Sequence, residues 1–178
     1  MNKMMQDKDI KISHSIAEVM GTFALDFKCK HLDPSQCYAT GLLSRIGKIG
    51  SDSNYEIMSG HIVNSFIKDS TLPIMVQALY CQSLSPREYS RIYDCPLELI
   101  PNEIILMWFA THMVQNDDEN PGNIIGLDSY LDLVAKCNSD KGLAYTYEKE
   151  TVDFLKDRIC QLGIAEKVVA YIEQWQEQ

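Results

Sequence analysis

The chain has 178 residues, of which 46% are hydrophobic and 23% charged, so it is long enough to bury a core and is not of the disordered class. The net charge of -9 and the lack of any basic run argue against a nucleic-acid partner. No apolar run approaches the roughly 20 residues that cross a bilayer. The six cysteines include no C-x-x-C pair. We therefore predict a cytoplasmic protein with no membrane association, no cofactor and no zinc ribbon.

Helical periodicity runs through nearly the whole sequence and predicts an all-α fold, a compact single-domain bundle of about eight helices. Residues 1–12 are polar and are expected to form an N-terminal segment outside the domain, which then covers residues 13–178. Ser15 and Glu18 have capping-box spacing ahead of an apolar stripe. The first helix is predicted from about Ser13 to about Lys30.

The second helix is predicted to start at Asp33-Pro34-Ser35-Gln36, with Asp as the N-cap, Pro at the first position and Gln three residues after the cap. Gly47 stands where a C-terminal glycine is expected. The predicted inner face consists of Tyr38, Leu42, Leu43 and Ile46.

A polar loop, Gly50 to Asn54, precedes a third helix, predicted from Tyr55 to Lys68. A fourth helix is predicted from Ile74 to Gln82, and a fifth from the capping box Ser85-Pro86-Arg87-Glu88 to about Asp94. The predicted packed side of the third helix consists of Ile57, His61, Ile62, Phe66 and Ile67.

The stretch from Asn102 to Gln115 is apolar on most sides and is predicted to be the central helix. An acidic surface loop follows, and residues 127–178 are predicted to add three amphipathic helices. Their expected ranges are 127–137, 147–162 and 164–175, with Gly163 as the hinge between the last two. No strand and no internal repeat is predicted.

The segment Gly41-Leu42-Leu43-Ser44-Arg45-Ile46-Gly47-Lys48 resembles the Gly-Leu-Leu-His-Asp-Ile-Gly-Lys motif of the HD superfamily of phosphohydrolases. In that family the adjacent His-Asp pair holds a divalent metal, which polarises a phosphate ester and activates water. Here the pair is Ser44-Arg45. The resemblance is strongest over residues 13–115 and implies an HD-like helical fold.

Other positions can be matched to the family in the same way. His14 and the Gly60-His61 element match histidines of the pattern. The stretch from Leu72 to Gln82 is similar to the HDOD branch of the family, which is associated with bacterial signalling. The residues that depart from the expected ligands are Ser44, Arg45, Cys81, Gln82 and Thr111.

The missing ligands lead us to expect a non-catalytic regulatory or binding module with a degenerate active site. Its pocket is expected to be formed by His14, Ser44, Arg45, His61 and Thr111. Arg45, together with Lys48, is a candidate for binding a small anionic ligand. The alternative is an internal salt bridge, for which Asp52 and Glu56 are the candidate partners.

Two other functions stay open at this point. One is a metal-dependent phosphohydrolase with a rearranged ligand set, for which His14, His61 and His112 are the candidates. The other is an unrelated helical interaction protein. In the non-catalytic interpretation, the partner is a protein, a second copy of the chain or a small anion.

Overall fold

A computed structural model of the chain describes residues 5–67, 72–137 and 143–177, and this part is all-α. Its only β-type pairing is the isolated bridge between Val114 and Ile124. The α-helices are α1 (Asp7–Phe23), α2 (Pro34–Leu42), α3 (Tyr55–Phe66), α4 (Pro73–Cys81), α5 (Pro86–Tyr93), α6 (Asn102–Met113), α7 (Leu127–Cys137), α8 (Leu143–Leu162) and α9 (Ala165–Gln176). Two short 3₁₀ helices, η1 (Ile46–Ile49) and η2 (Leu97–Leu99), lie between them.

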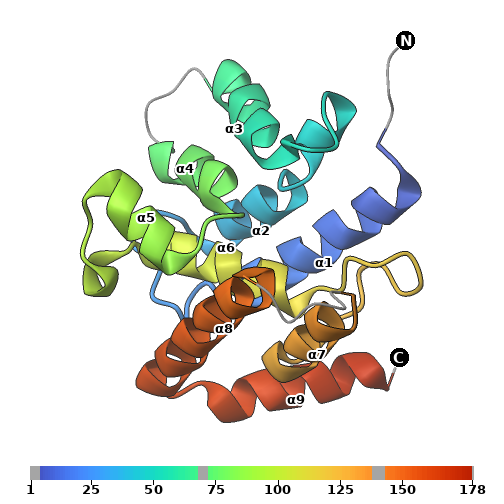
Figure 1. Cartoon of the computed structure of the whole chain (residues 1–178). Helices are drawn as coiled ribbons and strands as arrows, with labels where there is room; N and C mark the ends of the chain where they lie inside the picture. Colours follow the sequence, from blue (N-terminus) through green and yellow to red (C-terminus); the bar gives the residue numbers. More distant parts are fainter. Residues whose placement is uncertain (1–4, 68–71, 138–142, 178) are drawn as a thin grey trace.

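Helix α6 is the centre of the fold, as its all-round apolar sequence predicts. It contacts α1, α4, α7 and α8 (Figure 1), and its buried residues run from Glu103 to Ala110 without a break. The indole Nε1 of Trp108 donates to the carbonyl of Cys81 at 2.8 Å, which ties α6 to the end of α4. This bond satisfies a polar group that would otherwise be costly to bury.

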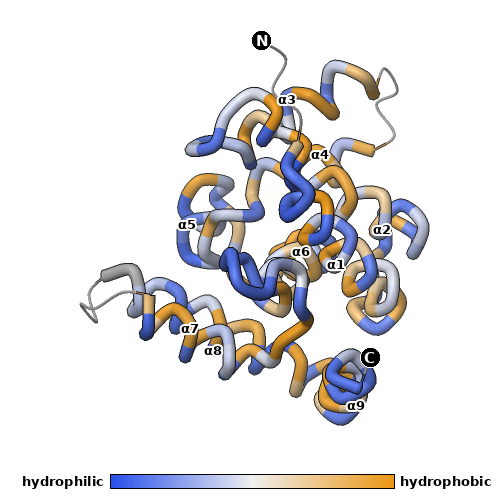
Figure 2. The backbone as a smooth tube through the Cα atoms, turned by 90° about the vertical axis from the view of Figure 1, so that its right-hand side faces the viewer, coloured by the Kyte–Doolittle hydropathy of each residue, from blue (hydrophilic) through white to orange (hydrophobic). Residues whose placement is uncertain are grey.

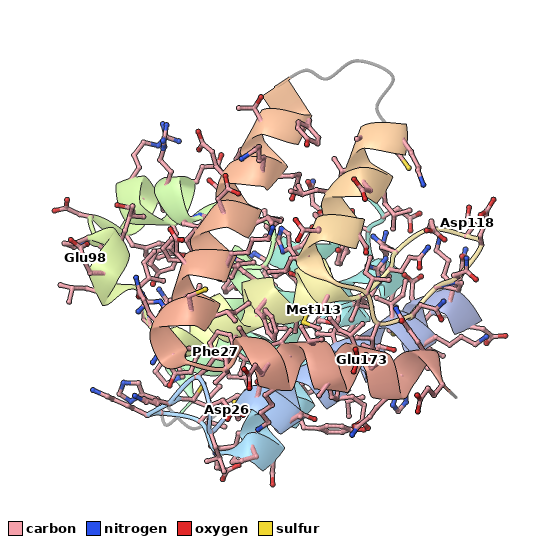
Figure 3. All side chains as sticks on the ribbon, turned by 90° about the horizontal axis from the view of Figure 1, so that it is seen from below. Asp26, Phe27, Glu98, Met113, Asp118 and Glu173 are labelled. Carbon is pink, nitrogen blue, oxygen red and sulfur yellow. The ribbon has the colours of Figure 1, made fainter. Side chains whose placement is uncertain are left out.

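The other helices lie on two sides of α1 and α6. Figure 1 shows α2 to α5 on one side and α7 to α9 on the other, and Figure 2 shows the α7–α8 pair at an edge of the molecule. In Figure 3, Glu98 and Asp118 lie at opposite edges, while Phe27 and Met113 lie between them, in agreement with their complete burial. No helix of these three described stretches has the length and apolar character needed to cross a membrane.

The first helix differs from its prediction at both ends. It begins at Asp7 rather than near Ser13, with Asp7 and Asp9 in its first turn, where carboxylates are favourable against the helix dipole. Ser15 is not a cap: it lies inside α1, and its hydroxyl donates to the carbonyl of Gly122 at 2.5 Å. The helix ends at Phe23 because the chain turns there toward Lys28, which has a positive φ of 55°.

Two predicted helix starts are confirmed in detail. Asp33 and Gln36 form a reciprocal capping box at the start of α2, and Ser85 and Glu88 form another at the start of α5. In both helices a proline occupies the first turn, where its missing N–H is not needed. These are local contacts over three residues, which explains why the sequence alone predicts them.

Helix α2 ends at Leu42, before the predicted Gly47. Gly47 lies instead in η1, packed so closely on the start of α3 that a Cβ atom would be 1.9 Å from the Tyr55 carbonyl oxygen. The residue is needed for this close approach and does not form a C-cap. The buried residues of α2 are Cys37, Thr40 and Gly41, whereas the predicted inner face of Tyr38, Leu42, Leu43 and Ile46 is half-buried.

The predicted packed side of α3 is wrong for three of its five residues, while Ile62 and Ile67 are half-buried and Ile67 packs against the core. Ile57 and Phe66 are exposed, Phe66 by 80%, and His61 is exposed as well. Ser59, Gly60 and Val63 are buried instead. Gly60 allows the Tyr80 ring of α4 to lie against the α3 backbone, since a Cβ there would be 2.6 Å from ring atoms. The predicted end of this helix, Lys68, lies outside the described residues.

The C-terminal helices agree closely with their predictions. Helix α7 has the predicted range, α8 begins at Leu143 rather than Tyr147, and α9 runs from Ala165 to Gln176. Gly163, between α8 and α9, has a φ of +69°, a conformation that glycine adopts without strain.

Candidate functional site

A polar cavity of about 260 Å³ opens beside α6, between α1, α7, α8 and the junction of η1 with α3. Its volume is slightly below the ~300–1,000 Å³ of pockets for drug-sized ligands. Its lining includes the polar residues Arg45, Tyr55, Glu56, Gln82, Thr111, His112, Tyr130, Tyr147, Glu148 and Thr151. Ile12 and Ile16 of α1 add an apolar part of the wall.

Arg45 enters this cavity wall and is paired with a carboxylate. Its Nε donates to Oδ1 of Asp9 at 2.8 Å, and the two residues are 4% and 5% exposed. The partner is therefore Asp9 and neither Asp52 nor Glu56, the two candidates from the sequence. Helix α1 starts early enough to carry Asp9 onto this face, since Asp9, Ile12 and Ile16 share one helical stripe.

Tyr55 lies against this ion pair. Nη1 of Arg45 is 3.4 Å from the Tyr55 hydroxyl, and the guanidinium carbon is 4.8 Å from the ring centroid. Lys48 approaches the same ring, with Nζ 4.4 Å from the centroid. Burial raises the pKa of the Tyr55 hydroxyl, while the charge of Arg45 opposes that rise. Tyr55 is therefore a neutral phenol at physiological pH.

His112 and Glu148 form a second charged pair on the opposite wall. His112 is 8% exposed; its Nδ1 is 2.7 Å from the Trp108 carbonyl and its Nε2 is 3.0 Å from Oε2 of Glu148. The Tyr130 hydroxyl donates to the same carboxylate oxygen at 3.0 Å. Burial works against the Glu148 carboxylate, but the hydrogen bonds and charge of His112 and the Tyr130 bond bring its pKa below the usual 4.5.

Both ring nitrogens of His112 face protein oxygens. Nδ1 lies against the Trp108 carbonyl, which only accepts, so Nδ1 carries a hydrogen. Nε2 lies against the Glu148 carboxylate. Both nitrogens of His112 are thus engaged by protein groups and are not left open to a metal or to a bound molecule.

Gln82 and Ser44 occupy two positions where the HD pattern expects histidines. The Gln82 amide donates to the Ser44 carbonyl at 2.9 Å, and the Ser59 hydroxyl donates to the same carbonyl at 3.0 Å. The Ser44 side chain is fully buried, and its Oγ has no hydrogen-bond partner among the described residues. The polar groups around Ser44 therefore stabilise the end of α2 through its backbone.

The structure brings together only part of the predicted pocket. Arg45 and Thr111 line the cavity, and Ser44 is buried next to Arg45 without lining it. His14 is exposed on α1. His61 is exposed on α3, where its Nδ1 is 3.0 Å from the Tyr80 hydroxyl. Neither histidine lines the cavity.

The alternative metal set of His14, His61 and His112 is wrong, because the first two are exposed outside the cavity and the third is fully hydrogen-bonded. Across residues 5–67, 72–137 and 143–177, no group of three or more His, Cys, Asp or Glu side chains is arranged to hold a metal ion. The two candidate anion-binding residues both lie against Tyr55, but only Arg45 lines the cavity; Lys48 donates to the Asp52 carbonyl at 3.2 Å.

Several residues of the site were not singled out from the sequence, among them Asp9, Tyr130 and Glu148. Asp9 could have been found by extending the Ile12–Ile16 stripe one turn toward the N-terminus. Glu148 likewise precedes the buried residues Thr151, Val152 and Leu155 at helical spacing. A carboxylate on an apolar stripe is a signal of a buried charged pair.

The fold and the cavity define this chain as an all-α protein with a polar pocket walled by two ion pairs. Comparison with protein-family models, curated proteins and solved structures finds no match.

Proposed function

We propose that this chain is a non-catalytic, HD-like regulatory module of bacterial-type cytoplasmic signalling, and that it binds a small polar ligand in the cavity beside α6. The observation that carries the proposal is the place of Arg45, which stands at the Asp position of the HD motif and lies in the cavity wall, neutralised by Asp9. A guanidinium has no lone pair for a metal, so this wall favours binding over metal-assisted hydrolysis.

Two further observations support the proposal. Gln82 and Thr111, at positions where the resemblance expects metal ligands, line the same cavity as Arg45. His112, the imidazole in the wall, already uses both nitrogens for protein contacts. The cavity therefore offers hydrogen bonds and fixed charges to a bound molecule, and no free imidazole for catalysis.

The test combines metal analysis with ligand screening on the full chain. The purified protein is incubated with manganese, nickel or zinc, desalted and analysed for metal, and then assayed with generic phosphomonoesters and phosphodiesters. We expect substoichiometric metal, no turnover above background, and a rise in melting temperature with at least one member of a panel of small polar metabolites.

A variant shows whether a bound molecule occupies this cavity. Thr111→Val replaces a lining hydroxyl with a methyl group of similar size, and Thr22→Val makes the same change at an exposed position of α1. The first change should weaken the ligand response and the second should not. Tight stoichiometric metal together with turnover would refute the proposed function.

A further inference from the structure

We infer that the ligand of this cavity is a small organic cation, carrying an ammonium or guanidinium group, rather than the anion that Arg45 suggests at first sight. The inference rests on the proposed function and specifies the ligand's chemical class.

The first argument is that Arg45 is already neutralised. Its Nε is bonded to Asp9 at 2.8 Å, and both side chains are almost fully buried. An incoming anion that drew Arg45 away would leave the Asp9 carboxylate buried without its partner, which costs more than an exposed contact returns. Arg45 therefore completes the wall and brings no uncompensated positive charge into the cavity.

The second argument is the charge that remains. The Arg45–Asp9 pair sums to zero, the Glu148 carboxylate is offset by at most one positive charge on His112, and the remaining acidic side chain of the wall is Glu56. Among the described residues, no Lys, Arg or His nitrogen is within ion-pair distance of Glu56. Its half-buried side chain lies in the first turn of α3. The cavity is thus net negative, within a chain of net charge -9.

The third argument is the aromatic lining. Tyr130 and Tyr147 face the cavity from α7 and α8, next to Glu148. Tyrosine ring faces attract cations, and the lining residue Tyr55 already has such contacts, with Arg45 and Lys48 within 5 Å of its centroid. The Glu56 carboxylate attracts an amine by its charge, and the tyrosine rings add cation–π contact. An anion is favoured neither by the carboxylate nor by the ring faces.

Four probes with four-carbon chains separate charge from shape. Putrescine carries two ammonium groups and 1,4-butanediol two hydroxyls, succinate is the four-carbon dicarboxylate, and agmatine replaces one ammonium group of putrescine with a guanidinium. Melting temperature and calorimetric affinity are measured for the full chain with each probe at constant ionic strength. We expect putrescine or agmatine to bind, and the diol and succinate not to.

Glu56→Gln should weaken binding of the cation by about tenfold or more, since a hydrogen bond between charged groups becomes one to a neutral amide. The matched control is Glu166→Gln, which removes an exposed carboxylate from the first turn of α9, outside the cavity. It should leave the affinity unchanged.

The outcomes separate this inference from the proposed function. Succinate or another anion binding in a Thr111-dependent way overturns the inference and leaves the proposed function standing. Cation binding that Glu56→Gln and Glu166→Gln weaken equally is general charge attraction, and it also overturns the inference. If no cation and no other small molecule binds, both fail.

Discussion

The buried pair of Asp9 and Arg45 gives the sharpest test of this structure. Asp9→Ala would leave the guanidinium of Arg45, 4% exposed, without its carboxylate. Breaking a buried ion pair from one side costs about 3–5 kcal/mol. Because Arg45 also borders the cavity, where water can reach it, we expect the lower end, about 3 kcal/mol. For a chain of this size that corresponds to a fall of about 6–12 °C in melting temperature.

The measurement is urea unfolding followed by circular dichroism, with Asp7→Ala as the matched control. Asp7 is in the same first turn of α1 but is exposed, so its loss should cost about 0.5 kcal/mol or less. The double variant Asp9→Leu with Arg45→Met removes both charges and should regain most of the lost stability. If Asp9→Ala costs no more than Asp7→Ala, the pair does not stabilise the fold, and the argument from Arg45 fails.

Three further predictions concern the same region. Gly47→Ala should destabilise the protein by about 1–3 kcal/mol in urea unfolding, because the new Cβ would be 1.9 Å from a backbone oxygen of α3. Gly50→Ala, whose Cβ would meet only a methionine side chain at 3.2 Å, should cost clearly less. Equal effects of the two variants would contradict the packing of η1 on α3. Ser59→Ala should lower the free energy of unfolding by about 1–3 kcal/mol, because the Ser59 hydroxyl accepts from the Gly47 N–H and donates to the Ser44 carbonyl. Ser44→Ala removes a buried hydroxyl that has no partner in the described structure, so it should be neutral or stabilising in the same measurement. The lowered pKa of Glu148 contributes stability that is present above the unfolded value of 4.5 and is lost as pH falls through the lower folded pKa. Unfolding curves of Glu148→Gln should therefore show a smaller loss of stability on acidification below pH 4.5 than those of the unsubstituted protein. If both proteins lose stability equally with falling pH, the result argues against the ion pair with His112.

The sequence predicted the parts of the fold that depend on neighbouring residues. The capping boxes at Asp33 and Ser85 involve a cap and a side chain three positions later, so the local pattern contains all the necessary information. The central position of α6 follows equally from its own apolar composition. In these cases the physical cause lies within one turn of the chain.

The failures have a different cause. The packed face of α3 was assigned by hydrophobicity, but Ser59 and Gly60 face inward because the close approach of η1 and of Tyr80 requires small residues there. That requirement comes from other helices and leaves no trace in the periodicity of α3. The partner of Arg45 was missed for the same reason, since Asp9 lies on α1, far away along the sequence.

Of the residues expected in the pocket from the HD resemblance, only some line the cavity. Arg45 and Thr111 do line one cavity, whereas His14 and His61, the two histidines that match the pattern, are exposed elsewhere. Histidine is common on helix surfaces, so its presence at a matching position is weak evidence for a ligand. A charged residue in an otherwise apolar helical face is stronger evidence, because it must be paired to be buried there.

The pairing of Arg45 also explains why a His-Asp pair could not simply be introduced at Ser44-Arg45. Arg45→Asp would place a second carboxylate against Asp9, and two carboxylates in a buried site cannot both ionise at neutral pH. A metal ion could compensate for them only with further ligands, but His14 and His61 are exposed outside this cavity, and both nitrogens of His112 are bonded. The wall is therefore adapted to a fixed internal cation, and the charge left over for a bound molecule is that of Glu56.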